Sequence, residues 1–282
     1  MQKSRKKFWI IFSCVLSSVI VLCSVFVLVT RLKTVTVTFR TRLAKDETVL
    51  ESGILDKVKN SGEFDFGKSI LFMNFDEAVE RIEKSNPYIK VEQVVRHFPN
   101  VARVYVSERI PMFRIMDENN EDKWYILDKD FKIVDVVTGD LKQNNYGSSS
   151  YYDKTIEISP DSITLISYVG AFINDDVDKN FLNSIARGIK SRADDLSKAK
   201  SVKIEKNAGD YRFTITMKNS GINNDDGCQI VIEGKSKLED KVLAGVCCFC
   251  ENTENQNTFD LSSKKIIIEE VNGEFVGRLQ SK

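Results

Sequence analysis

The sequence predicts a mixed α+β protein in which a single N-terminal transmembrane helix precedes two folded domains. Residues 8–30 form a run without any charged residue. The rest of the chain contains short stretches in which apolar and polar residues alternate, a pattern typical of strands. Between them stand stretches with apolar residues three and four positions apart, the spacing of amphipathic helices. We expect a β-rich second domain with flanking helices after a smaller first one.

The apolar run is long enough to cross a membrane. As a helix it would span roughly 34 Å, at about 1.5 Å per residue, whereas the hydrocarbon core of a bilayer is about 30 Å thick. A cleaved signal peptide is the alternative, but its apolar region is shorter and ends at small residues. This run ends in the bulky residues Val27, Leu28 and Val29. A lipoprotein signal at Cys23 is disfavoured because Leu22 stands where a small residue is needed. We expect an uncleaved anchor.

The charges beside the anchor predict its orientation. Four basic residues, Lys3, Arg5, Lys6 and Lys7, precede it, and no acidic residue does. Basic residues are retained on the cytoplasmic side of membrane proteins. We therefore expect residues 1–7 to be a cytoplasmic tail and everything after the anchor to be extracytoplasmic.

The charge balance of the exported part argues against nucleic-acid binding. The chain has 41 basic and 41 acidic residues, and removing the four basic residues before the anchor leaves 37 against 41. A mildly acidic domain does not neutralise phosphates, so nucleic acid is not an expected partner.

The first exported domain is predicted to contain three strands and two helices. Asp46 is a candidate cap for the first helix, and Asp76 starts the second, which ends at Ser85-Asn86-Pro87. A turn at 98–100 joins the last two strands. The expected elements are, in order, a strand at 34–39, a helix from Asp46 that is stopped by Asn60-Ser61-Gly62, a helix at 76–85, and strands at 91–97 and 101–107.

Four short motifs in this domain resemble the FtsQ/DivIB cell-division family and its POTRA domain. The motifs occur in order after a single anchor. They are Gly67-x-x-Ile70-Leu71-Phe72, Pro87-x-Ile89, Arg96-x-x-Pro99 and Val106-x-Glu108-Arg109-x-Pro111. The resemblance implies a POTRA-like βααββ fold for residues 31–110.

The motif residues have structural explanations. Gly67 supplies a backbone angle that other residues resist, and Pro99 presets a turn. Pro111 lacks an amide donor, so we expect it to end the last strand and mark the domain junction. Glu108 and Arg109 are neighbours on a strand, so their side chains point to opposite faces and each is expected to tether a neighbouring loop.

The second domain, residues 111–271, reads as strands with two main helices, and residues 272–282 are expected to be a C-terminal tail. The clearest helix carries the apolar face of Val177, Phe181, Leu182, Ile185 and Ile189. The remaining elements are strands at 112–115, 123–128, 132–137, 201–205, 211–217, 228–233, 258–261 and 264–270, a helix start at 159–161, and helices at 176–199 and 236–249.

No catalytic constellation is apparent. The only histidine is His97, in the hairpin beside Pro99. A lone histidine is usually an ordinary surface or core residue, so we expect no catalytic role for it. Without a second histidine no multi-histidine zinc site can form, and no Ser-His-Asp triad can form elsewhere in the chain. No glycine-rich phosphate loop occurs. We expect no catalytic residues, no metal, no cofactor and no small-molecule substrate.

Four cysteines lie in the exported part. Their spacing lacks the paired C-x-x-C of zinc sites. Outside the cytoplasm a disulfide is a candidate, and buried thiols are the alternative. The candidate pairs join Cys228 to Cys247, Cys248 or Cys250.

The family resemblance implies a function in the bacterial divisome. Members are non-enzymatic bitopic membrane scaffolds that hold FtsB/DivIC-like and FtsL-like proteins and help to regulate septal peptidoglycan synthesis. In this family the partner adds a strand to the last sheet edge. By this resemblance, we expect the partner-binding edge to be the stretch Lys264, Lys265, Ile266, Ile267, Ile268 and Glu269.

The stretch before these residues departs from the family pattern, and other interpretations of the chain stay open. Ser262 and Ser263 stand where many members have Arg-Tyr, so those members' side-chain contacts are not carried over. A plain core strand is the simpler interpretation of 264–269. The alternatives for the whole chain are a POTRA-type transport or chaperone module that binds polypeptides, or an exported sensor domain.

Overall fold

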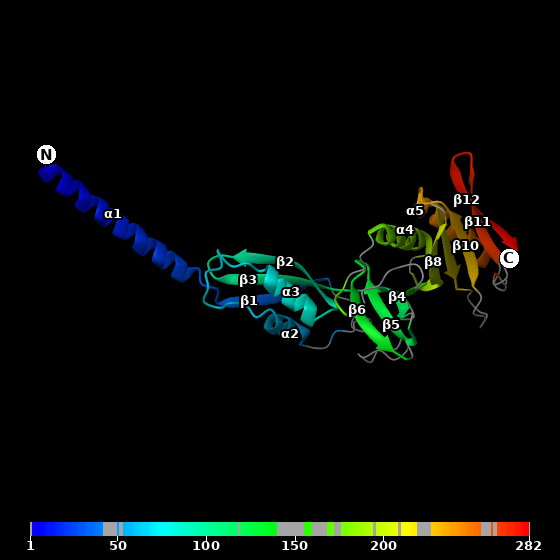
Figure 1. Ribbon diagram of the computed structural model, residues 1–282, viewed down its shortest axis with the longest axis horizontal. Helices are drawn as coiled ribbons and strands as arrows, with labels where there is room; N and C mark the ends of the chain where they lie inside the picture. Colours follow the sequence, from blue (N-terminus) through cyan, green and yellow to red (C-terminus); the bar gives the residue numbers. More distant parts are fainter. Residues whose placement is uncertain are drawn as a thin grey trace. The chain divides into compact units, whose positions relative to one another are not determined.

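The computed structural model describes residues 2–41, 50, 53–117, 119–139, 155–159, 168–171, 176–193, 196–207, 210–218, 227–254, 261 and 264–281. The chain divides into two compact units, Met1–Glu108 (unit 1) and Arg109–Lys282 (unit 2) (Figure 1). Helices and strands occur in both units, which confirms the predicted mixed α+β class with an N-terminal apolar helix.

Unit 1 begins with a long apolar helix, α1 (Gln2–Val29). Its stretch Trp9–Val29 has a mean hydropathy of 2.8 and is long enough to cross a membrane. This stretch is apolar on all sides, as expected of a helix whose every face meets lipid. Two of its hydroxyls are satisfied within the helix, because Ser17 donates to the carbonyl of Cys14 and Ser24 to that of Ile20.

After α1 the chain forms a three-stranded sheet with two helices. Their order is the predicted strand–helix–helix–strand–strand. The central strand β3 is parallel to β1 and antiparallel to β2. The elements are β1 (Thr34–Thr41), α2 (Ile54–Ser61), α3 (Asp76–Ser85), β2 (Ile89–His97) and β3 (Val101–Glu108).

Both helices pack on the sheet through the apolar side chains that the spacing predicts. Val58 of α2 and Ile82 of α3 are fully buried, and so is Val104 at the centre of β3. All three belong to one apolar cluster, which is the core of a two-layer unit. In Figure 1 the two helices lie side by side along the sheet.

The start of the first helix differs from the prediction, whereas the start of the second agrees with it. The described helix α2 begins at Ile54, after Gly53 in a left-handed conformation with φ of 85°, while the expected cap Asp46 lies outside the described residues. Helix α3 begins at Asp76, as predicted, and ends at Ser85. At this position the carboxylate of Asp76 interacts favourably with the positive end of the helix dipole.

Unit 2 is built on a nine-stranded sheet with the order β12-β11-β10-β9-β8-β7-β4-β5-β6. Pairings are antiparallel except β4–β7, β7–β8 and β10–β11. Its strands are β4 (Pro111–Asp117), β5 (Asn120–Asp128), β6 (Ile133–Thr138), β7 (Ile156–Ile158), β8 (Ala199–Asn207), β9 (Asp210–Met217), β10 (Cys228–Glu233), β11 (Lys264–Val271) and β12 (Glu274–Ser281).

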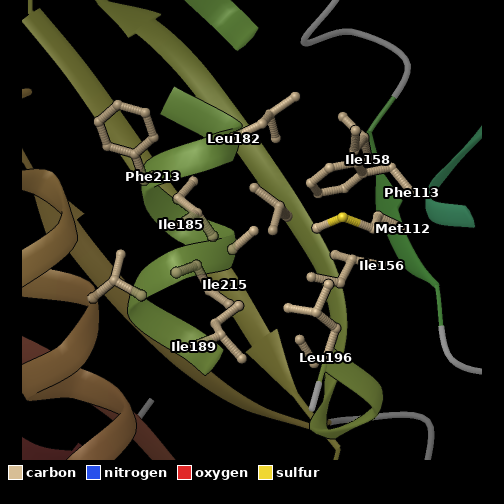
Figure 2. Packing of buried hydrophobic residues seen from close by; sticks show 14 of the residues in the cluster. Met112, Phe113, Ile156, Ile158, Leu182, Ile185, Ile189, Leu196, Phe213 and Ile215 are labelled. Carbon is tan, nitrogen blue, oxygen red and sulfur yellow. The ribbon is translucent and has the colours of Figure 1, made fainter. Parts of the chain in front are cut away.

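Two helices pack on this sheet, α4 (Asp176–Ala193) and α5 (Leu238–Glu254). Figure 2 shows Leu182, Ile185 and Ile189 of α4 pointing into the same core as Phe213 and Ile215 of β9. The three helix residues recur at intervals of three and four, so they line one face. The predicted apolar face of this helix therefore builds the core of unit 2.

Helix α4 and strand β7 of unit 2 differ from the prediction. Helix α4 ends at Ala193 rather than at Ala199, because a short 3₁₀ turn (Leu196–Lys198) and strand β8 follow. Strand β7 has three residues, too few for a recognisable alternation. The helix expected from 159–161 and most of the strand expected at 258–261 lie outside the described residues.

Candidate partner-binding edge

The last two strands form a tight hairpin. Asn272 and Gly273 connect β11 to β12, with φ angles of 55° and 86°. Two positive φ angles in a two-residue connection are the signature of the type I′ turn, which Asn-Gly favours. The pairing continues without a shift from Val271–Glu274 to Lys264–Ser281.

This hairpin corrects the predicted edge. The stretch 264–269 belongs to β11, which pairs with β12 on one side and with β10 on the other. The expectation that these residues form the sheet edge is therefore wrong, as is the expectation of a tail at 272–282. The Asn272-Gly273 pair between two alternating stretches was the sequence signal for the additional strand.

The edge strand is β12, which has β11 as its only neighbour among the described strands. Phe275, Gly277 and Leu279 are half-buried, and the residues between them are exposed. In a two-residue hairpin the residues flanking the turn exchange both hydrogen bonds. This register predicts that the amides of Phe275, Gly277 and Leu279 face away from β11, where another strand could bind.

A groove of ≈ 500 Å³ lies between this edge and α5. Its apolar lining includes Leu243, Ala244 and Phe275. The complete lining consists of Lys237, Asp240, Leu243, Ala244, Cys247, Cys248 and Glu251 from the α5 side, with Gly273, Glu274, Phe275, Val276 and Gly277 from the hairpin. Residues of the hairpin edge and of one helix face therefore share a single surface.

Gly277 allows β12 to lie close to α5. A Cβ atom built on it would lie 2.7 Å from Cβ of Cys248 and 3.0 Å from the carbonyl oxygen of Ala244. Both distances are shorter than ordinary van der Waals contacts. A glycine at this position is therefore a packing requirement of the groove.

The charges around the groove favour a cationic ligand. Three carboxylates, Asp240, Glu251 and Glu274, line it together with Lys237. The ammonium groups of Lys237 and Lys241 each lie 5.6 Å from the centre of the Phe275 ring, within the range of a cation–π interaction. A basic segment carrying apolar side chains would match this lining.

Two cysteines, Cys247 and Cys248, line the groove, and the thiol of Cys248 is not an activated nucleophile. Burial raises the pKa of Cys248, and the nearby Glu251 carboxylate raises it further. A raised pKa keeps the thiol protonated at neutral pH. Cys228 at the start of β10 and Cys250 in α5 are buried, while Cys247 and Cys248 are half-buried. The disulfide of Cys228 stays a prediction.

The remaining predicted residues serve the scaffold of unit 1. Arg96 donates to the carbonyl of Ile70 at 3.1 Å and to that of Met73 at 2.8 Å. It thereby holds the segment before α3 against β2. Gly67 has φ of 92°, as its predicted role requires, and Pro99 lies in the turn between β2 and β3. Pro87 follows Asn86, the C-cap of α3.

Arg109 and Pro111 belong to unit 2. Arg109 binds Asp128 at the end of β5, with 2.5 Å between Nη1 and Oδ2, and both side chains are at least 96% buried. Asp128 also accepts the backbone amides of Asp130 and Lys132. Pro111 begins β4 instead of ending β3, while Glu108 is the last residue of β3. Sequence reasoning missed Asp128, because nothing local connects it to Arg109.

The family comparison matches unit 1. Residues 30–109 match the family described as POTRA domain, FtsQ-type. Unit 1 after its anchor is an FtsQ-type POTRA domain. This match supports membership of the chain in the FtsQ/DivIB family, as the four motifs predict, and with it a role in cell division. No curated protein matches the chain. FtsQ-type POTRA proteins are generally non-enzymatic scaffolds that take part in protein–protein interactions in a membrane complex.

Proposed function

We propose that this protein is a non-enzymatic scaffold of the bacterial divisome that binds its partner by strand addition to β12. The partners are membrane proteins of the FtsB/DivIC and FtsL types, and the assembly helps to regulate septal peptidoglycan synthesis. The proposal rests on the FtsQ-type POTRA domain together with an edge strand beside a groove in unit 2.

Strand addition uses chemistry that β12 offers. A partner strand would pair with the outward-facing amides and carbonyls of Phe275, Gly277 and Leu279, so that the main chain supplies affinity. Its alternate side chains would enter the groove beside α5, where they supply specificity. The acidic rim of Asp240 and Glu251 would favour a lysine or arginine next to the added strand.

The same proposal includes the orientation of the chain. The basic residues before α1 favour a cytoplasmic N-terminus, which leaves both folded units outside the cytoplasm. We place the protein in the cell membrane, and the FtsQ-type POTRA domain supports a position at the division septum. A fluorescent fusion at the N-terminus would concentrate at mid-cell during septation, and a uniform membrane signal would contradict this.

The test of the edge uses two substitutions of one residue. Leu279→Pro removes an outward-facing amide and places a ring against the incoming strand, while Leu279→Ala removes the side chain but keeps the amide. The full-length chain would be titrated with the FtsB/DivIC-type protein of the same organism. Losing one hydrogen bond of about 1 kcal/mol and the close approach of the strand should weaken binding about tenfold or more for Leu279→Pro.

The matched variant decides the interpretation. Leu279→Ala should bind more tightly than Leu279→Pro, and both should leave the thermal unfolding of unit 1 unchanged because they lie in unit 2. Equal binding by the proline variant and the unchanged chain would contradict strand addition to β12. Equal loss in both variants would assign the effect to the leucine side chain.

A further inference from the structure

The POTRA domain carries a small set of exposed apolar side chains. Among the described residues of unit 1 that follow α1, the large apolar side chains in the exposed class are Phe66, Leu71, Phe72 and Phe98, here called the apolar rim. Phe72 is 81% exposed and Phe98 61%. None of the four is needed for the core, so their exposure calls for another explanation.

Three members of the rim lie on a loop that is fastened to the end of α1. The amide of Ile70 donates to the carbonyl of Thr30 at 2.8 Å, and the amide of Leu32 donates to that of Lys68 at 2.8 Å. The hydroxyls of Thr30 and Ser69 are 2.7 Å apart and buried. Residues 66–72 therefore lie at the level where the chain leaves the helix.

The fourth member lies beside the helix itself. The ring of Phe98 is 5.9 Å from the ring of Phe26, measured between centroids. Phe26 is part of the apolar stretch Trp9–Val29, and three residues from its end correspond to about 4.5 Å along a helix axis. Phe98 is therefore at the depth of the last turn of the membrane-spanning stretch. The amide of Lys33 donates to Asn100 at 2.9 Å and fixes the 98–100 turn there.

The sheet direction places the rest of the domain away from this end. Strand β1 starts at Thr34, next to Val101 at the start of β3, and runs to Thr41. At about 3.3 Å per residue, Thr41 is roughly 23 Å along the strand from Thr34. All four rim residues thus belong to one end of the domain, the end from which α1 emerges.

Cationic side chains accompany the rim. Arg31, Lys33 and Lys68 are exposed on the segments that carry the rim or adjoin it, and Lys68 pairs with Asp65 at 2.7 Å. Apolar side chains next to lysine and arginine are the composition of segments that lie in the membrane interface, where the rings enter the acyl boundary and the cations meet anionic headgroups.

We propose that the apolar rim enters the lipid bilayer beside α1, so that the POTRA domain is held to the membrane by the 66–72 loop and the 98–100 turn as well as by the helix. The ligand is the bilayer surface itself. Continuity with α1 favours this occupant over a second protein, because the contact of Phe98 with Phe26 already places one rim residue within the depth of the membrane-spanning stretch. Attachment at three points would fix the orientation of the domain relative to the membrane.

The test places a single tryptophan at the rim of the full-length chain. In a Trp9→Phe, Trp124→Phe background, Phe72→Trp and Phe98→Trp report on the rim, and Thr41→Trp, an exposed site at the far end of β1, is the matched control. The proteins would be reconstituted in vesicles of phosphatidylcholine and phosphatidylglycerol, with or without phosphatidylcholine brominated near the headgroup end of its acyl chains.

The proposal expects both rim variants to show blue-shifted emission and a loss of intensity with the brominated lipid, whereas the Thr41→Trp chain shows neither and is quenched by aqueous iodide. Rim emission as red and as iodide-sensitive as the control would overturn the proposal. A blue shift without bromine quenching would also overturn it, since a protein surface would then cover the rim. Phe72→Trp changes a side chain that is 81% exposed, so it tests the proposal even if Phe98→Trp fails to fold.

Discussion

The two edge strands of the nine-stranded sheet, β6 and β12, differ in how they are covered. The side chains of β6 are mostly buried, and the backbone of its first residue, Ile133, is bonded on its outer side. The amide of Gly170 donates to the carbonyl of Ile133, and the amide of Ile133 donates to that of Ala171, each at 2.8 Å. In β12 the side chains alternate between exposed and half-buried.

This difference indicates which edge of the sheet is protected and which is open to pairing with another strand. Proteins cover or interrupt sheet edges because unpaired amides and carbonyls attract other strands. Here segment 168–171 covers the start of one edge, while the other edge faces a groove beside α5. This difference between the two edges favours β12 as the binding surface, and four pairs of substitutions test it.

The largest expected effect is on the covered side. Arg109→Ala would leave Asp128 as an uncompensated buried charge, and breaking a buried ion pair typically costs about 3–5 kcal/mol of unfolding free energy. The matched variant on the open side is Arg278→Ala, which removes an exposed pair with Glu269 at 3.0 Å. That pair is worth about 0–1 kcal/mol. Urea unfolding of unit 2 measures the loss of unfolding free energy in each variant. Similar losses in the two variants would contradict the difference between the covered and the open side of the sheet.

The second prediction concerns the packing of the open edge. Gly277→Val would force side-chain atoms against Cys248 and the Ala244 carbonyl, and overpacking of this kind costs about 1–3 kcal/mol. It should also displace β12 and weaken partner binding. Val276→Ala is the control, because an exposed side chain changes stability by about 0.5 kcal/mol or less. Unchanged stability of Gly277→Val would mean that β12 does not lie against α5.

The third prediction concerns segment 168–171, which covers the start of β6. Gly170 has φ of 91°, a conformation that costs a residue with a Cβ atom about 1–2 kcal/mol. Gly170→Val should therefore speed hydrogen exchange at the amide of Ile133, while Gly170→Asn, which tolerates this conformation, should change it less. If the valine variant also gained partner binding at β6, exposure alone, rather than the groove, would select the binding edge.

The smallest effect is a pH dependence near the turn between β4 and β5. A hydrogen bond from the Tyr125 hydroxyl, the backbone amide of Asn119 and the Lys123 ammonium lower the pKa of Asp117 from 3.8 to about 2. Because the folded pKa lies below the unfolded one, this stabilisation is complete above pH 3.8 and is lost as the pH falls through about 2.

Asp117→Asn should remove this part of the acid dependence, and Tyr125→Phe should reduce it. Urea midpoints measured above pH 3.8 and near pH 2 would reveal the change. A midpoint of the unchanged chain that falls no more than that of Asp117→Asn would contradict the role of this carboxylate.

Sequence reasoning found elements whose signals are local. The helix at 76–85 and the apolar face of Leu182, Ile185 and Ile189 follow from the spacing of apolar residues. The four POTRA motifs predicted the fold of unit 1. The site was found in part. The family resemblance and the alternation of residues located strand β11 but assigned the sheet edge to it. The Asn272-Gly273 turn signal indicated that a further strand, β12, follows.

The remainder depends on distant contacts. Nothing near Arg109 indicates that Asp128 will neutralise it, because their pairing arises only when β4 and β5 come together. The apolar rim is likewise invisible in the sequence, where Phe66 and Phe98 look like ordinary core residues. The groove needs both α5 and β12, whose contact is set by Gly277.

The central claim, that β12 is the edge to which a partner strand adds, is tested most directly by amide hydrogen exchange of the full-length chain with and without its FtsB/DivIC-type partner. We expect the amides of Phe275, Gly277 and Leu279 to exchange rapidly in the free protein and to become protected in the complex, with β6 unchanged. Protection confined to β6 or to unit 1, with rapid exchange persisting in β12, would contradict the account.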